Sequence, residues 1–360
     1  MESKRSRVQA ARIDRRAALA WAGAFAPSSS RVLLATLTLL PPSASAQPAR
    51  TPKVALVFAT ALVGEKSGPV PIDADVRDFL QGLQERGYID GRNVTVVVRS
   101  ADGDLKRLPQ IIKQLVEDKV DVIVTGGPGV SAAREATQTI PIVAVVDTPV
   151  ESGLASTFAK PGGNVTGFTI VSDVAMMLGK RLQLLKEVVP RARRVAVVDF
   201  KHIDPIQTPG PYRRRLAIEP VARDLGLTVV HVGITEEADV EPALAAIDAA
   251  RVDMLMVLNT PVTYLHKSRI IAFTTNRRLP SIHDSPEFVQ AGALMSYSSD
   301  EDVGRRSAAY VAKILRGAKP GDLPFEQPMQ YSLAINRATA KAIGIEIPRA
   351  TLLRADLVVD

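Results

Sequence analysis

Short apolar runs alternate with longer amphipathic segments along the chain from residue 53 onward. The runs are rich in valine and isoleucine, as in strands buried on both faces, and the longer segments have apolar residues at helical spacing. In the first half, the pattern predicts strands at 53–58, 94–98, 120–124, 142–146 and 165–170, with helices at 73–86, 108–118 and 130–137. In the second half, it predicts helices at 176–188, 216–225, 240–250 and 265–276, with strands at 195–198, 227–232 and 254–258. Two half-chains of the same strand–helix order predict an α/β fold with two doubly wound parallel-sheet lobes.

One segment of the second half departs from this alternation. Lys201–Tyr212 contains three prolines and a glycine, which predicts a long loop after a strand. The basic triplet Arg213–Arg215 follows it, and we interpret the triplet as the solvated start of the next helix. A role in binding is the alternative for these arginines.

The first 46 residues have the features of an export signal. Arg15 and Arg16 precede apolar stretches at 17–26 and 32–40, and Ala44-Ser45-Ala46 forms a small-residue cleavage site before Gln47. The paired arginines suggest the twin-arginine route. An uncleaved membrane anchor is the alternative, but neither stretch reaches the roughly 18–20 residues needed to span a bilayer. The chain has no cysteine, so neither a lipid anchor on cysteine nor a disulfide is available. We therefore expect a soluble periplasmic protein.

The net charge of +7 belongs mostly to this leader. Residues 1–46 carry seven basic and two acidic residues, which leaves 38 basic and 36 acidic residues from Gln47 onward. The body of the protein therefore has no excess of positive charge to attract a polyanion. We expect a monomer with no nucleic-acid partner.

Short polar residues and glycines recur where the predicted strands end. The carboxyl ends of parallel strands meet at one edge of a sheet, where small ligands bind in open α/β folds. A few oriented donors and acceptors on an apolar floor are what such a site needs. The candidate ligand-binding residues are Thr60, Ala61, Gly126, Gly127, Ser131, Asp147, Thr148, Asn259, Thr260, Tyr297 and Ser298.

Two of these strand ends carry specific chemistry. Residues 125–129, Thr-Gly-Gly-Pro-Gly, lie between a strand and a helix, where backbone N–H groups can hold an anionic ligand group. No Gly-Lys-Ser/Thr follows, so the segment is not a P-loop, and a tight turn remains the alternative. The Asp147 carboxylate could pair with a ligand ammonium group, or it could cap the segment that starts at Pro149.

Catalytic and metal-binding motifs do not occur in the sequence. The four histidines are scattered without metal-ligand spacing, and no G-x-S-x-G nucleophile elbow is present. We therefore expect no catalytic residue, no metal site, no cofactor and no enzymatic activity.

Several ordered blocks resemble one protein family. They cover residues 79–93, 120–125, 139–143, 147–154, 160–167, 179–186 and 279–344. The chain resembles the substrate-binding proteins of ABC transporters related to tryptophan- and tyrosine-binding components. The resemblance implies the type I periplasmic-binding-protein fold, with hinges at about 168–173, 298–300 and 325–328. Lobe one would then comprise 47–170 plus 299–326, and lobe two 171–298 plus 327–360.

The resemblance also implies a function. Such a protein closes its two lobes on a small-molecule solute in the interlobe cleft, here an amino acid or a related compound, and presents it to an ABC permease. Residues 60–66 and 199–205 differ from the family's usual segments, so the substrate of the aromatic-amino-acid binders is not carried over. The alternatives are a periplasmic sensory protein and a small-molecule enzyme on the same fold. A LacI-type repressor would need a DNA-binding headpiece where this chain has its leader.

Overall fold

The computed structural model describes residues 50–360 apart from 61–72, 202–208 and 300–301. The predicted export signal and its cleavage site lie outside the described residues. Within the described part of the chain, no helix is long and apolar enough to cross a membrane.

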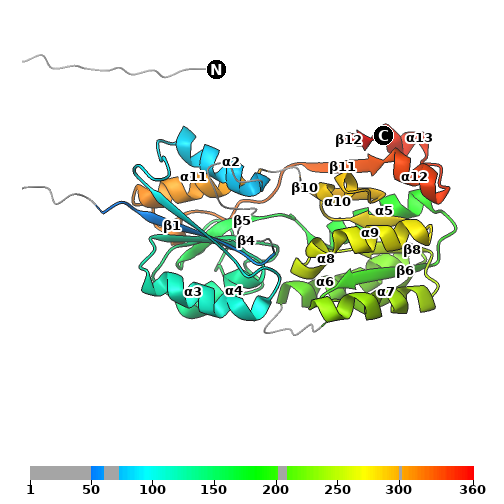
Figure 1. Ribbon diagram of the computed structural model, residues 1–360, viewed down its shortest axis with the longest axis horizontal. Helices are drawn as coiled ribbons and strands as arrows, with labels where there is room; N and C mark the ends of the chain where they lie inside the picture. Colours follow the sequence, from blue (N-terminus) through cyan, green and yellow to red (C-terminus); the bar gives the residue numbers. More distant parts are fainter. Residues whose placement is uncertain (1–49, 61–72, 202–208, 300–301) are drawn as a thin grey trace, which may run out of the picture. The chain divides into compact units, whose positions relative to one another are not determined.

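The first lobe is built on a five-stranded, fully parallel sheet of order β2-β1-β3-β4-β5 (Figure 1). Its strands are β1 (Lys53–Phe58), β2 (Thr95–Ser100), β3 (Val122–Gly126), β4 (Ile142–Val146) and β5 (Val165–Thr169). Its helices are α2 (Ala74–Glu85), α3 (Leu108–Glu117), α4 (Pro128–Ala136) and α11 (Val303–Leu315), with the 3₁₀ turns η1 (Leu105–Arg107) and η3 (Pro320–Asp322). Helix α11 is distant in sequence but packs beside α2.

Alternate residues of each strand form two separate cores in this lobe, because successive side chains of a strand point to opposite faces. Leu56 of β1 packs in one cluster with Phe79 of α2 and Tyr310 of α11. Val57, its neighbour, packs in the other cluster with Ile112 of α3 and other residues of α3 and α4. The sheet is therefore covered on both faces, which explains its near-continuous apolar strands.

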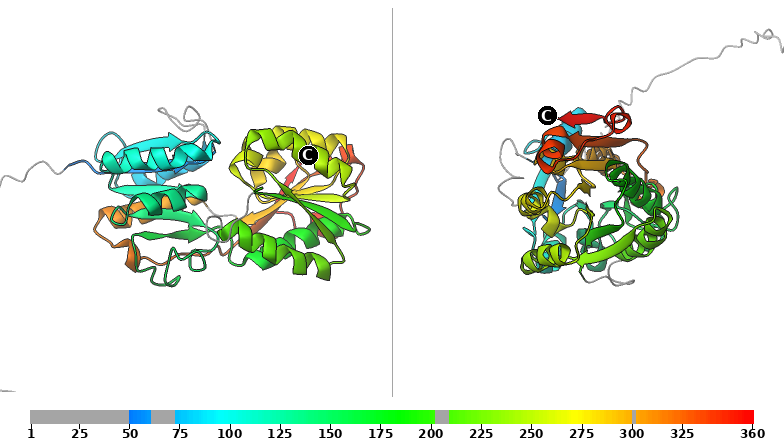
Figure 2. Two further views of the ribbon diagram at one scale, coloured as in Figure 1. Left: turned by 90° about the horizontal axis from the view of Figure 1, so that it is seen from below. Right: turned by 90° about the vertical axis from the view of Figure 1, so that its right-hand side faces the viewer.

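The second lobe is built on a seven-stranded sheet of order β12-β11-β10-β9-β8-β6-β7, in which only β10 and β11 pair antiparallel (Figure 2). Its strands are β6 (Arg194–Asp199), β7 (Thr228–Gly233), β8 (Met254–Val257), β9 (Ser281–His283), β10 (Met295–Ser299), β11 (Tyr331–Asn336) and β12 (Leu357–Val359). Helices α5 (Val174–Val188), α6 (Pro209–Asp224), α12 (Arg337–Ile343) and α13 (Arg349–Leu352) contribute to one core. Helices α7 (Val240–Ala249), α8 (Pro261–Leu265), α9 (Lys267–Asn276) and α10 (Pro286–Gln290), with the 3₁₀ turn η2 (Glu237–Asp239), lie over the other face.

Two of the predicted hinge segments are hydrogen-bonded to each other. The Thr169 amide donates to the Glu326 carbonyl at 2.9 Å, and the Glu326 amide donates to the Gly167 carbonyl at 3.1 Å. Gly167 has φ +148°, and a Cβ atom there would lie 2.0 Å from the Ala144 carbonyl oxygen. Only glycine allows β4 and β5 to approach this closely.

The predicted α/β fold of two parallel-sheet lobes is confirmed. The predicted loop over Lys201–Tyr212 is wrong at its C-terminal end, because α6 already begins at Pro209. The backbone N–H groups of the first helical turn have no partner within the helix, so proline, which lacks an N–H, is tolerated there. Prolines in this segment therefore start the helix instead of preventing it. The helix predicted at 265–276 corresponds to α9, which begins at Lys267, and the short helix α8 that precedes it was not predicted. The residue boundaries of the lobes and hinges remain predictions.

Candidate functional site

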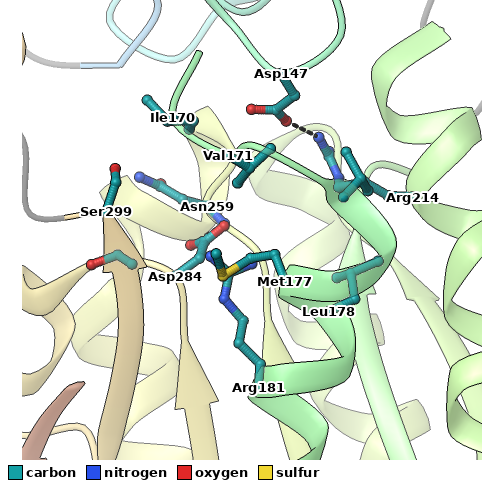
Figure 3. A pocket seen from close by; sticks show the side chains of 12 residues that line it. Asp147, Ile170, Val171, Met177, Leu178, Arg181, Arg214, Asn259, Asp284 and Ser299 are labelled. Atoms are coloured by element: carbon teal, nitrogen blue, oxygen red, sulfur yellow. Dashed lines mark hydrogen bonds and ion pairs between the residues drawn. The ribbon is translucent and has the colours of Figure 1, made fainter. Parts of the chain in front are cut away.

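Two adjoining pockets lie at the carboxyl ends of strands from both sheets. The first has a volume of about 140 Å³. It is lined by Asp147, Ile170, Val171, Val174, Met177, Leu178, Arg181, Arg214, Asn259, Asp284, Ser298 and Ser299 (Figure 3). The second has a volume of about 260 Å³. It is lined by Phe58, Thr60, Asp73, Ala74, Asp75, Ile170, Asn259, Tyr264, Asp284, Ser285, Pro286, Glu287, Ser298, Ser299 and Val303.

The two pockets adjoin, because they share several lining residues. Both are lined by Ile170, which follows β5, by Asn259 and Asp284, which follow β8 and β9, and by Ser298 and Ser299 at the end of β10. The strand order places β8, β9 and β10 side by side. Their carboxyl ends therefore bring an amide, a carboxylate and two hydroxyl groups to one place.

Arg214 of α6 is fully engaged by two carboxylates. Its Nε and Nη2 donate to the two Asp199 oxygens at 3.0 and 2.8 Å, and its Nη1 donates to Asp147 Oδ2 at 3.1 Å. Burial by itself lowers the pKa of Arg214, but the charge of Asp199, its hydrogen bonds and the charge of Asp147 together raise that pKa above its ordinary value. The guanidinium thus joins the end of β4 to the end of β6 and stays charged.

Arg181 of α5 is the more available cation. Only 5% of its surface is exposed, and its Nε donates to the Tyr297 carbonyl at 2.8 Å. Within the described residues its two terminal nitrogens have no hydrogen-bond partner, and Figure 3 shows the guanidinium pointing towards Asp284. Burial lowers the pKa of Arg181, an effect that the charge of Asp284 opposes. A buried guanidinium with unused donors facing a pocket is a strong receptor for an anionic ligand group.

Asp284 is the carboxylate between the two pockets. Its Oδ1 accepts a hydrogen bond from the backbone N–H of Asn259 at 2.8 Å. Burial raises the pKa of Asp284, and the nearby Arg181 charge opposes that rise. Together with Asp147 it gives the first pocket two negative charges beside its two guanidinium groups.

The structure brings only some of the predicted site residues together. Asp147, Asn259 and Ser298 line the first pocket, and Thr60, Asn259 and Ser298 line the second. The residues that line neither pocket are Gly126, Gly127, Ser131, Thr148, Thr260 and Tyr297. Ala61 lies outside the described residues. Asp147 already pairs with Arg214, which neither the ammonium-binding nor the helix-capping hypothesis anticipated.

Local hydrogen bonds explain why several predicted residues lie away from the pockets. The Thr260 hydroxyl caps α8 by accepting from the Thr263 amide at 3.2 Å. Tyr297 points to the opposite face of β10 from Ser298, where its ring stacks on Tyr331 with centroids 5.8 Å apart. The Gly127 amide donates to the Val145 carbonyl at 3.2 Å, and Gly127 has φ +51°. These contacts favour the tight-turn interpretation of residues 125–129.

The sequence hypothesis for the basic triplet is wrong at its middle residue. Arg213 and Arg215 are exposed, as expected for a solvated helix start, but Arg214 lies inside the ion-pair cluster. Arg181 and Asp284 were not predicted at all. The sequence did contain a signal for Arg181, because a charged residue there occupies the apolar face of α5 together with Leu178 and Leu182. Among the described residues, no group of three or more His, Cys, Asp or Glu side chains could hold a metal ion.

Comparison with known proteins now gives this site a context. The family model described as ABC transporter substrate binding protein matches residues 67–359. The chain belongs to this family. This substrate-binding protein is 27% identical over 281 residues to a tyrosine-binding protein of Clostridioides difficile strain R20291, covering 76% of this chain and 78% of that relative.

Solved structures agree with this assignment. A conserved domain protein from Vibrio cholerae is 29% identical with a TM-score of 0.76, covering 86% of this substrate-binding protein and 100% of that chain. A Streptococcus protein described as an ABC domain in complex with L-Trp is 21% identical with a TM-score of 0.75, with the same coverage, and shows the shared fold. The substrate-binding protein thus has the type I periplasmic-binding fold, with its pockets at the strand ends of both lobes.

Proposed function

We propose that this substrate-binding protein captures a zwitterionic amino acid or a close analogue outside the cytoplasmic membrane and delivers it to an ABC permease. The observation that carries the proposal is the buried Arg181, whose terminal nitrogens face a pocket that also contains Asp147 and Asp284. Opposite charges fixed a few atoms apart are complementary to an α-carboxylate and an α-ammonium group on one carbon.

The remaining contacts of the first pocket fit the same ligand. The α-carboxylate would accept hydrogen bonds from Arg181, and the α-ammonium would donate to Asp284 and to the hydroxyl of Ser298. Met177 and Leu178 supply an apolar floor beneath these polar groups. The similarity to a tyrosine-binding protein supports an amino acid as the ligand class.

The cellular setting is part of the proposal. Residues 1–46 would direct export and be removed, with the twin-arginine route suggested by Arg15 and Arg16. The mature protein would then act as a monomer in the periplasm, and lobe closure over the ligand would create the surface that docks on the permease. The family assignment supports this setting, because its members serve ABC transporters.

Calorimetric titration of the purified protein with L-amino acids tests the proposal. We expect saturable binding of at least one L-amino acid, and loss of that binding when its carboxylate is amidated or its amine is acetylated. Arg181→Met should weaken the affinity at least tenfold, because the ligand carboxylate loses its charged donor. Arg215→Met is the matched control, since Arg215 is an exposed arginine on α6.

Two results would contradict the proposal. One is affinity for the amino acid that is unchanged in Arg181→Met, and the other is equally tight binding of the amidated or acetylated derivatives. The melting temperature of each variant without ligand shows whether a loss of binding reflects a loss of folding.

A further inference from the structure

One ion pair joins side chains of the two lobes at the first pocket. Asp147 follows β4 of the first sheet, whereas Arg214 belongs to α6, which packs in a core of the second lobe. The Nη1 atom of Arg214 donates to Asp147 Oδ2 at 3.1 Å, the contact marked by a dashed line in Figure 3, and both side chains line the first pocket. Both partners belong to the protein, so this link between the lobes does not require a ligand.

Arg214 is held in place by a carboxylate of its own lobe. Asp199, at the end of β6, accepts from Nε and Nη2 with its two oxygens at 3.0 and 2.8 Å. A bidentate pair of this kind fixes the plane of the guanidinium and leaves Nη1 free to reach the other lobe. The side chains of Arg214, Asp199 and Asp147 are only 15%, 11% and 19% exposed, so water weakens their attraction less than at an open surface.

The segment that carries Asp147 is held by hydrogen bonds of its own. The backbone N–H and the hydroxyl of Ser152 both donate to the Thr148 carbonyl, at 3.0 and 2.6 Å. The backbone N–H of Leu154 donates to the Pro149 carbonyl at 2.9 Å, and the Leu154 side chain packs against the core beneath α3 and α4. Since this segment is fixed to the first lobe, the ion pair constrains the lobes themselves and not two mobile side chains alone.

The ion pair can also break without leaving a buried charge unpaired. When the lobes separate, Arg214 keeps both of its hydrogen bonds to Asp199, and Asp147 becomes accessible to water. Loss of a buried pair is costly mainly where one charge is left uncompensated, which does not occur here. Arg213 makes a second contact across the same gap, from Nη2 to the Glu151 carbonyl at 3.5 Å, but this contact is long and exposed and contributes little.

We propose that the Asp147–Arg214 ion pair is a latch that holds the two lobes closed in the absence of a ligand. The latch raises the closed fraction of unliganded molecules, and it has to open for a ligand to enter or leave. A ligand that binds the closed arrangement gains apparent affinity when that arrangement is already populated. The inference goes beyond the proposed function and does not depend on the chemical class of the ligand.

Double electron–electron resonance between two spin labels, on the purified protein without ligand, tests the latch. The chain has no cysteine, so Lys113→Cys on α3 and Ala245→Cys on α7, both at exposed positions, place one label on each lobe. We expect Asp147→Asn, which keeps the shape of the side chain and removes its charge, to shift and broaden the distribution of distances between the labels. Asp322→Asn, the same change at an exposed position of the first lobe outside both pockets, should leave the distribution unchanged.

The outcomes separate the ion pair from other causes. An unchanged distribution in Asp147→Asn, or an equal change in Asp322→Asn, would overturn the latch. Asp147→Glu keeps the charge and should retain a distribution closer to the wild type, whereas a change as large as that in Asp147→Asn would show that charge does not hold the lobes. The melting temperature of each variant shows whether a changed distribution reflects a loss of folding. No ligand is added, so a negative result leaves the proposed function intact, and a protein that binds no amino acid can still show the latch.

Discussion

The buried histidine at the end of β9 should make the protein sensitive to mild acid. His283 is fully buried, and its ring stacks on Phe288 with centroids 4.5 Å apart. Its Nε2 lies 3.2 Å from the Ser281 hydroxyl, and its Nδ1 has no hydrogen-bond partner among the described residues. Burial lowers the pKa of His283 from 6.5 to about 3. The folded protein therefore keeps a neutral imidazole where the unfolded chain takes up a proton.

The size of the effect follows from this difference in pKa. Above pH 6.5 the imidazole is neutral in both states, so its burial costs no stability through protonation. As the pH falls from 6.5 towards the folded pKa, only the unfolded state takes up the proton, and the folded protein loses stability. A pH of 5 lies about 1.5 units below the pKa of the unfolded imidazole. Protonation of the unfolded state therefore lowers the free energy of unfolding by about 2 kcal/mol at that pH. This figure depends little on the folded pKa, because the folded imidazole is still neutral at pH 5.

Urea unfolding at pH 7.5 and pH 5, followed by circular dichroism, measures the effect in the wild type and in His283→Leu. Leucine cannot be protonated, so the wild type should lose about 2 kcal/mol more stability than the variant between the two pH values. The burial-raised pKa of Asp284 acts in the opposite direction, stabilising the folded state on acidification, but Asp284 is present in both proteins. A difference below about 0.5 kcal/mol would refute the reasoning.

Two further predictions concern the fold around the site. Arg214→Met should cost about 3–5 kcal/mol of unfolding free energy, because Asp199 and Asp147 lose their shared cation. The control Arg215→Met, at an exposed position, should cost less than about 0.5 kcal/mol. Similar losses for the two variants in urea unfolding would contradict the ion-pair role of Arg214. Gly167→Ala should lower the melting temperature and the soluble yield sharply, because its Cβ would lie 2.0 Å from the Ala144 carbonyl oxygen. Gly163→Ala, where a Cβ meets no atom within 4 Å, should leave the melting temperature and the soluble yield unchanged. If Gly167→Ala left them unchanged too, the spacing of β4 and β5 would tolerate a side chain.

Much of the fold could be predicted because parallel strands buried on both faces are continuous apolar runs. β1 is buried at four consecutive positions, and the sequence pattern found it with the same bounds. Short elements near the C-terminus gave weaker patterns, so β9, with three residues, was not predicted. The start of α6 was mistaken for a loop because prolines favour turns and first helical turns alike.

The candidate site could be predicted only where strands contribute to it. Asp147, Asn259 and Ser298 lie at strand ends, and sheet geometry brings such ends together. Whether Tyr297 or Ser298 faces the pocket depends on strand register, which a single sequence does not fix. Arg181 and Arg214 come from helices, and their contribution depends on how each helix is rotated over the sheet.

The position of α11 in the chain affects the order in which the molecule can assemble during synthesis. A nascent chain that has emerged as far as Ser299 contains all strands of the first sheet, but it still lacks Tyr310 and Val311, which complete the core beside α2. The second sheet is likewise incomplete until β11 and β12 have been synthesised. Domains usually fold one after another from the N-terminus as they leave the ribosome. Here both lobes reach a finished core only as the last elements emerge, so a truncation before α11 would leave neither half intact.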